Sequence, residues 1–212
     1  EMCIRDSCNA PFIVFAEVSG SIQGDPNKKL STRPKMSLEE SKKYYEKISE
    51  MGKYLQDEGM PLAFHHHMGT VIESQDDTVR LLENTDDTVK LTLDTGHMLF
   101  AKGDSLEILK NFGERVIHIH CKDIRKNILE KSLKEDFSFR GAFLEGAFTV
   151  PGDGCINYRP LFDILKKNNY SGWLVVEAEQ DPAIANPFEY AKIGYNYLTD
   201  TLNKSGINIY KK

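Results

Sequence analysis

Five short apolar runs alternate with longer amphipathic segments along most of the chain. The apolar runs occupy residues 11–18, 61–67, 90–94, 116–120 and 173–177. The runs are short and nearly all apolar until their last residue or two, and ionisable side chains then appear at their carboxyl ends. Alternation of this kind predicts a parallel sheet covered by helices, either open and doubly wound or closed into a barrel. In a parallel barrel, active sites lie at the carboxyl ends of the strands.

The segments between these runs have helical signals. Ser37-Leu-Glu-Glu40 is a capping box, apolar residues follow it at helical spacing, and Gly59 ends the pattern. Other helices are expected over residues 76–84, 104–112, 158–168 and 187–202, and an irregular helical stretch with a break near Gly141 over residues 124–148. Thr95–Gly96 is expected to form a turn, and Pro151–Gly154 a loop.

Composition narrows the classes of function. The chain has 212 residues and a formal net charge of −5, which disfavours nucleic-acid binding because that needs a basic face. No apolar run approaches the roughly 20 residues of a membrane span, and no secretory signal is visible. The four cysteines lack paired spacing, so neither a zinc knuckle nor a disulfide framework is supported. A reduced, cytoplasmic chain is therefore expected.

The first residues differ in pattern from the rest. The chain begins with Glu1 rather than Met, and EMCIRDSCN at residues 1–9 fits nothing downstream. We interpret residues 1–9 as a non-native leader and residues 10–212 as a partial TIM-barrel catalytic domain. An uninterrupted genomic reading frame through these residues would contradict the first interpretation.

All six histidines stand at or just after the end of an expected strand. They are His65, His66, His67, His97, His118 and His120. Imidazole is a common ligand of first-row metals and is largely neutral near pH 7.

Strand geometry groups these residues further. Side chains alternate between the faces of a strand, so His65 shares a face with His67, His118 with His120, and Glu177 with Glu179. Asp94 ends the strand that lies between the two histidine strands. Imidazoles and carboxylates that converge from several strand ends predict a site for a divalent metal such as Mn²⁺, Co²⁺ or Zn²⁺.

Each element also has a simpler interpretation. The three consecutive histidines fit a polar strand end in water, and the two later strand histidines fit buried side chains bonded to the backbone. Asp94 fits a turn in which it bonds its own backbone. Glu177 fits a cap on the segment that follows it. One shared metal site accounts for all of these residues together.

Lys122 and Asp123 directly follow the second histidine strand. A lysine beside a metal can act as an acid or base, or bind a substrate oxygen, because desolvation shifts its pKa readily. The alternative is a surface Lys–Asp pair.

Six motifs lie along the chain: Ala16-Glu17, HHHMGT at 65–70, DTGH at 94–97, HIHCKD at 118–123, FTVPGDG at 148–154 and WLVVEAEQDP at 173–182. Together they resemble the inosose dehydratases, a family within the xylose isomerase-like (β/α)₈ barrel superfamily. The resemblance that rests on these motifs covers roughly residues 11–200. The resemblance implies an α/β fold, an incomplete TIM barrel with about strands four to eight. Because the first three strands are missing from that set, we expect this polypeptide to be poorly soluble or inactive.

The resemblance also implies a set of site residues. One divalent metal, Mn²⁺ or Co²⁺, is expected on Asp94, His120 and Glu177. The fourth ligand of the superfamily is usually a Glu on the strand that here carries His65, so the choice lies between His65, which we take, and Glu73. The catalytic residues are expected to be Lys122, His97, His67 and Glu179. Residues expected to bind substrate are Glu17, His66 and His118.

The reaction implied is removal of water from 2-keto-myo-inositol, a small polyol ketone, to give a trihydroxycyclohexane-dione. Glutathione has been linked to this activity, although no residue here explains a thiol requirement. The alternatives are a metal-dependent sugar isomerase or epimerase of the same superfamily, or a non-catalytic fragment. No nucleic-acid or membrane partner is expected, and a homo-oligomer is left open.

Overall fold

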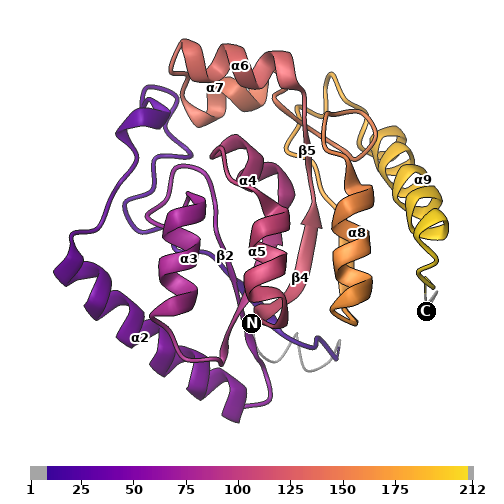
Figure 1. The fold of residues 1–212 in the computed structure, drawn as a ribbon. Helices are drawn as coiled ribbons and strands as arrows, with labels where there is room; N and C mark the ends of the chain where they lie inside the picture. Colours follow the sequence, from indigo (N-terminus) through magenta and orange to yellow (C-terminus); the bar gives the residue numbers. More distant parts are fainter. Residues whose placement is uncertain (1–8, 210–212) are drawn as a thin grey trace.

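The structure is a computed structural model that describes residues 9–209 (Figure 1). Its centre is a five-stranded parallel sheet in the order β1-β2-β3-β4-β7. The strands are β1 (Ile13–Phe15), β2 (Leu62–His65), β3 (Val89–Asp94), β4 (Val116–Cys121) and β7 (Trp173–Val176). The predicted α/β class and parallel half-barrel are confirmed. The leader predicted over residues 1–9 lies, apart from Asn9, outside the described residues.

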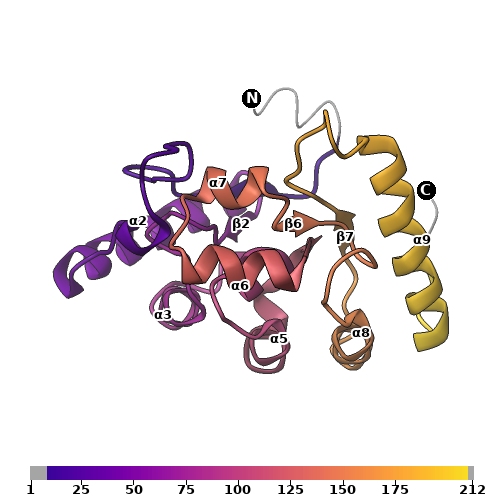
Figure 2. The same ribbon diagram turned by 90° about the horizontal axis from the view of Figure 1, so that it is seen from above.

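Helices connect the strands and cover the sheet. They are α2 (Leu38–Asp57), α3 (Gln75–Glu83), α4 (Thr95–Phe100), α5 (Ser105–Phe112), α6 (Lys126–Lys134), α7 (Phe139–Leu144), α8 (Tyr158–Lys167) and α9 (Pro187–Ser205), with 3-10 turns η1 (Leu30–Thr32) and η2 (Gly113–Arg115). Seen from above, α2, α3, α5, α8 and α9 form an arc along one side of the sheet (Figure 2). Helices α6 and α7 lie beyond the carboxyl ends of the strands (Figure 1).

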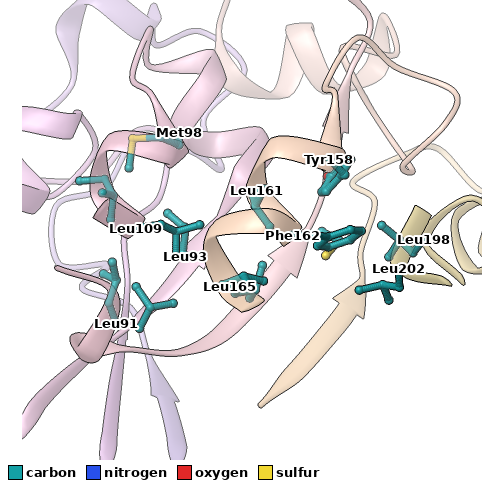
Figure 3. Packing of buried hydrophobic residues seen from close by; sticks show 14 of the residues in the cluster. Leu91, Leu93, Met98, Leu109, Tyr158, Leu161, Phe162, Leu165, Leu198 and Leu202 are labelled. Atoms are coloured by element: carbon teal, nitrogen blue, oxygen red, sulfur yellow. The ribbon is translucent and has the colours of Figure 1, made fainter. Parts of the chain in front are cut away.

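Residue alternation along β3 explains how the fold separates core from site. Leu91 and Leu93 are fully buried in the main core, a cluster that also contains Leu109 of α5, Phe162 of α8 and Leu198 of α9 (Figure 3). Thr92 and Asp94 alternate with these leucines and therefore point to the opposite face. The side of the sheet away from the helices, at its carboxyl edge, is consequently the polar one.

Two expectations were wrong in detail. The turn predicted at Thr95–Gly96 is the start of α4, because the Asp94 carboxylate caps the His97 backbone N–H at 2.8 Å. Gly141 does not break the 124–148 segment but lies inside α7, where its N–H donates to Ser138 Oγ at 3.0 Å. The break is at residues 135–138.

The same segment contains a two-stranded ribbon that the sequence pattern does not predict. Strand β5 (Asp123–Ile124) pairs antiparallel with β6 (Phe148–Thr149). The ribbon and the α6–α7 pair between its strands share an apolar cluster that includes Leu30, Phe139 and Phe148. This cluster lies beside the carboxyl ends of the sheet strands, so it forms a wall of the region described next.

Candidate metal centre and the adjoining lysine

Four metal-ligating side chains converge from four neighbouring strands. His65 ends β2, Asp94 ends β3, His120 lies near the end of β4, and Glu177 follows β7 directly. Parallel register places Asp94 opposite His120, and His120 opposite Val175. One ligand atom of each of the four residues lies within 4.8 Å of the others. The structure thus brings together the four residues predicted to hold a metal.

The distances within this group are short. His65 Nε2 lies 3.0 Å from His120 Nδ1, and His120 Nδ1 lies 2.8 Å from Glu177 Oε2. Asp94 Oδ2 is 3.5 Å from His120 Nδ1 and 3.6 Å from His65 Nε2. Ligand atoms that lie about 2.0–2.2 Å from one ion lie roughly 3–4 Å from one another. The distances within this group are therefore similar to those around a single shared ion.

The donor set fits a divalent metal. Asp94 Oδ2 and Glu177 Oε2 are buried and accept no hydrogen bond of good geometry from the described residues. Burying carboxylate oxygens whose charged neighbours are poorly aligned for hydrogen bonding costs free energy, which a cation between them would offset. Two imidazole nitrogens and two carboxylate oxygens suit Zn²⁺, Co²⁺ or Mn²⁺. His65, Asp94, His120 and Glu177 are therefore the residues that would hold it.

The electrostatics of the ligand group favour positive charge. Burial alone would lower the pKa of His120, but its contacts with Asp94 and Glu177 raise that pKa to about 9. Burial alone would raise the pKa of Asp94, yet the Lys122 ammonium and the neighbouring imidazoles hold it well below its usual range. Both shifts show that the carboxylates of this group stabilise positive charge beside them.

Lys122 lies directly beside these ligands, and its side chain is only 1% exposed. Its Nζ is 3.2 Å from Asp94 Oδ2 and 3.3 Å from Glu177 Oε2. It also donates to Glu179 Oε2 at 2.9 Å. The surface-pair alternative for Lys122 and Asp123 is thus excluded by burial, since Asp123 is buried as well.

A second group surrounds the same ammonium. His67, His97 and Glu179 offer ligand atoms within 4.8 Å of one another. His97 Nε2 lies 3.0 Å from Lys122 Nζ and 3.3 Å from Glu179 Oε2, and His67 Nε2 lies 3.6 Å from Glu179 Oε1. The four residues predicted to be catalytic therefore form one cluster, and Lys122 joins it to the metal ligands.

Protonation states in the cluster follow from burial and charge. Burial and then the Lys122 charge lower the pKa of His97 well below its usual range, so its imidazole is neutral. Burial disfavours the Lys122 ammonium, but Asp94, Glu179 and Glu177 together raise its pKa. Burial raises the pKa of Glu179, but His67 and Lys122 lower it overall. The cluster offers a neutral imidazole, a carboxylate and a buried ammonium.

Two aromatic rings close the cluster on one side. Phe148 lies with its ring centre 5.2 Å from that of His97 and 5.5 Å from Lys122 Nζ. Phe139 of α7 lies 5.4 Å from the His67 ring. Sequence reasoning missed both, and the one available signal for Phe148 was its place at the start of the FTVPGDG motif. These rings exclude water from the groups they contact.

Three residues predicted to bind substrate lie outside the two groups. His66 is fully buried, and its Nε2 accepts a hydrogen bond from Asp94 N at 3.2 Å, which supports the metal-binding strand. His118 lies on β4 next to His120, with ring centres 5.0 Å apart. The Glu17 carboxylate accepts a hydrogen bond from Ser19 N at 2.7 Å. Their contact with substrate stays a prediction.

Glu73, the alternative fourth ligand, is placed elsewhere. Its carboxylate accepts a hydrogen bond from Gly69 N at 2.6 Å and pairs with Arg33 Nε at 3.2 Å. The described geometry therefore favours His65 over Glu73.

Comparison with known proteins assigns this chain to a protein family. Residues 4–201 match the family described as the xylose isomerase-like TIM barrel. The chain belongs to that family. Within it, an inosose dehydratase of Clostridium beijerinckii is 44% identical over 90% of this chain and 65% of its own length. An inosose dehydratase of Clostridium perfringens is 42% identical over 94% of this chain and 69% of its own length.

A relative with a different name is also similar. The rhizopine catabolism protein MocC of Rhizobium meliloti is 38% identical over 97% of this chain and 63% of its own length. The chain thus spans 63–69% of the length of these three relatives. The predicted resemblance to inosose dehydratases in the xylose isomerase-like family is confirmed.

Solved structures share the fold of this xylose isomerase-like chain. A structure of the IOLI protein with a bound zinc atom matches 97% of this chain and 64% of its own, with a TM-score of 0.60 and 20% identity. A fusion of a xylose isomerase-like TIM barrel with a 4-hydroxyphenylpyruvate dioxygenase matches 99% of this chain and 32% of its own, with a TM-score of 0.68 and 16% identity. At these identities the likeness shows the fold. Of the helices within residues 9–209, none is long and apolar enough to span a bilayer.

Proposed function

We propose that this chain carries the catalytic centre of a metal-dependent inosose dehydratase, which removes water from 2-keto-myo-inositol. The observation that carries the proposal is the position of Lys122. Its ammonium lies 3.2 Å from Asp94 in the metal-ligand group and 2.9 Å from Glu179 in the second group. The inosose dehydratases at 42–44% identity support the substrate class.

Dehydration of a β-hydroxy ketone needs three functions close together. The carbonyl oxygen must be stabilised, a base must take the α-proton, and an acid must give a proton to the β-hydroxyl so that it leaves as water. A divalent ion on the four ligands would act as a Lewis acid toward an oxygen of the substrate. The chain supplies the other two functions.

Acid and base are drawn from the cluster around Lys122. The ammonium is a proton donor held in a site that Phe148 shields from water. The neutral His97 imidazole and the ionised Glu179 carboxylate are proton acceptors, and both lie within 3.0 Å of Lys122 Nζ. His67 contacts Glu179 and would orient it. Because donor and acceptors are neighbours, one substrate can contact both.

The test is turnover of 2-keto-myo-inositol by the protein expressed from the complete reading frame that encodes this chain. The dione product is followed by its ultraviolet absorbance after chelation and after addition of Mn²⁺ or Co²⁺, with glutathione as a separate arm. Product that depends on metal is the expected result. Bound metal with an intact fold and no product would contradict the proposal, and turnover of ketoses instead would identify an isomerase or epimerase.

A further inference from the structure

Four consecutive residues, Asp94 to His97, all contact Lys122. The Asp94 carboxylate and the His97 ring lie 3.2 Å and 3.0 Å from Nζ. Between them, Thr95 Oγ1 donates to the Lys122 carbonyl at 2.6 Å and accepts from the Lys122 N–H at 3.2 Å. The end of β3 and the first turn of α4 therefore hold this lysine from its main chain to its charged end.

Gly96 provides the space for the lysine side chain. A Cβ at this position would lie 2.6 Å from Lys122 Cγ and 2.9 Å from its Cβ. The alkyl chain thus lies against the glycine backbone, with no room to change rotamer on that side. Because ordering a long side chain costs rotamer entropy, this packing limits the rotamers of Lys122 and so determines where its ammonium lies.

The Lys122 main chain is held by a second hydroxyl from a distant element. β4 ends at Cys121 and β5 begins at Asp123, so Lys122 lies between strands of two different sheets. Tyr158, the first residue of α8, donates its phenolic hydrogen bond to the Lys122 carbonyl at 3.0 Å. Its Oη is also 2.8 Å from Thr95 Oγ1. The two hydroxyls and the carbonyl form a closed triangle.

Tyr158 is completely buried, and its ring packs against Phe162 and Tyr197 in the core. Phenylalanine would fill that space equally well, so packing alone does not require the hydroxyl. Among the described residues, the hydroxyl donates to the Lys122 carbonyl and lies 2.8 Å from Thr95 Oγ1. Burial raises the pKa of Tyr158 well above its usual range, so the hydroxyl keeps its proton and remains a donor.

We propose that Tyr158 is a positioning residue: with Thr95 it fixes the main chain of Lys122, and so holds the ammonium between the metal ligands and the His67–His97–Glu179 group. The effect of this position on catalysis rests on the proposed function. The positioning itself is a property of the fold and can be measured separately.

The first experiment compares Tyr158→Phe with Tyr170→Phe in the protein expressed from the complete reading frame that encodes this chain. Tyr170 is a matched control because its hydroxyl donates to a backbone carbonyl, that of Trp173, at 2.9 Å and takes no part in the site. A small misplacement of a reacting group costs roughly ten- to a hundred-fold in rate. We expect Tyr158→Phe to lower kcat by that factor with KM and metal affinity within two-fold, and Tyr170→Phe to leave kcat unchanged.

Thr95 allows a test by rescue. Thr95→Val keeps the shape but removes the hydroxyl, and Thr95→Ser keeps the hydroxyl. We expect Thr95→Val to lower kcat by the same factor as Tyr158→Phe. We expect kcat of Thr95→Ser to be at least ten-fold higher than that of Thr95→Val. Equal kcat values for the two variants, at equal metal content and melting temperature, would overturn the proposal.

The second experiment needs no turnover. Lysine ¹³Cε signals are recorded in the Zn²⁺-loaded protein, and the Lys122 signal is assigned by its loss in Lys122→Gln. The expected result is a shifted or broadened signal in Tyr158→Phe and an unmoved one in Tyr170→Phe. An unmoved signal in Tyr158→Phe overturns the proposal. If the wild type does not dehydrate inosose but the signal moves, the proposed function fails while the positioning role stands.

Discussion

Gly96 illustrates at the scale of one residue how an absent side chain shapes the site. The space that its Cβ would fill contains the Lys122 alkyl chain. Backbone conformation is not the reason for the glycine, because Gly96 does not have a positive φ. The reason is the close approach of the Lys122 side chain. The DTGH pattern alone does not show this contact, because Lys122 lies elsewhere in the sequence.

Gly96→Ala is expected to displace Lys122 and to lower the free energy of unfolding by about 1–3 kcal/mol, as overpacked cores do. Urea denaturation measures the change. Gly24→Ala is the matched control, because a Cβ at Gly24 would meet no atom within 4 Å. Equal unfolding midpoints for the two variants would contradict the packing argument.

The position of His65 makes it a better candidate for the fourth metal ligand than Glu73. His65 Nε2 lies 3.0 Å from His120 Nδ1, whereas Glu73 pairs with Arg33. We expect His65→Ala to weaken metal binding by more than the roughly 10–100-fold that loss of an outer-shell contact costs, and Glu73→Gln to change it little. Calorimetric titration of the metal-free protein with Zn²⁺ decides between them, and the reverse ranking would identify Glu73 as the ligand.

At the scale of elements, the start of α3 is linked to the loop that precedes α2. Ser74 and Asp77 form a capping box, and Arg33 Nη2 contacts Asp77 Oδ2 at 2.7 Å. Burial alone would raise the pKa of Asp77, but the Ser74 hydrogen bonds and the Arg33 charge lower it overall. Because the folded pKa lies below the unfolded value of about 4, this carboxylate stabilises the fold above pH 4.

Asp77→Asn is therefore expected to lower the free energy of unfolding by about 1–2 kcal/mol at pH 7. The difference from wild type should persist at pH 5 and shrink below about pH 4, as the pH falls through the folded pKa. Urea denaturation at several pH values measures it. Asp76→Asn, an exposed neighbour in the same helical turn, is the control. A difference that grows on acidification would refute the sign of the effect.

Long periodic elements could be predicted from the sequence, and short ones could not. The capping box at Ser37 predicted α2 correctly, and the short run at residues 90–94 predicted β3, because both signals are local. β5 and β6 have two residues each and depend on each other across the chain. Local pattern has no information about such a pair. For the same reason, the sequence did not predict that Phe139 and Phe148 line the candidate site.

The histidine and carboxylate positions were predictable because strand ends in a parallel sheet meet at one edge. The separate role of His66 was not predictable. Parity placed it on the face opposite His65, but its hydrogen bond to the Asp94 backbone depends on tertiary packing.

At the scale of the whole molecule, the metal ligands join β2, β3, β4 and the segment after β7. A metal that binds the folded state alone stabilises it by about 2.7 kcal/mol at a hundred times its Kd. We expect Zn²⁺, Co²⁺ or Mn²⁺ to raise the melting temperature of the chelated protein. Asp94→Asn, which changes one ligand, is expected to abolish most of that increase in scanning calorimetry. A rise of equal size in that variant would indicate that the ion binds elsewhere.

The parallel pairing of these strands has a kinetic consequence. Each pairing joins residues far apart in the chain, as His118 with Trp173, so a long crossover has to close for each pair of strands to form. Non-local pairing of this kind slows folding, because the chain loses loop-closure entropy before the strand contacts stabilise it. The four ligands are complete only when the last strand has docked. A bound ion would therefore act after the folding barrier: it would slow unfolding while leaving the rate of refolding unchanged.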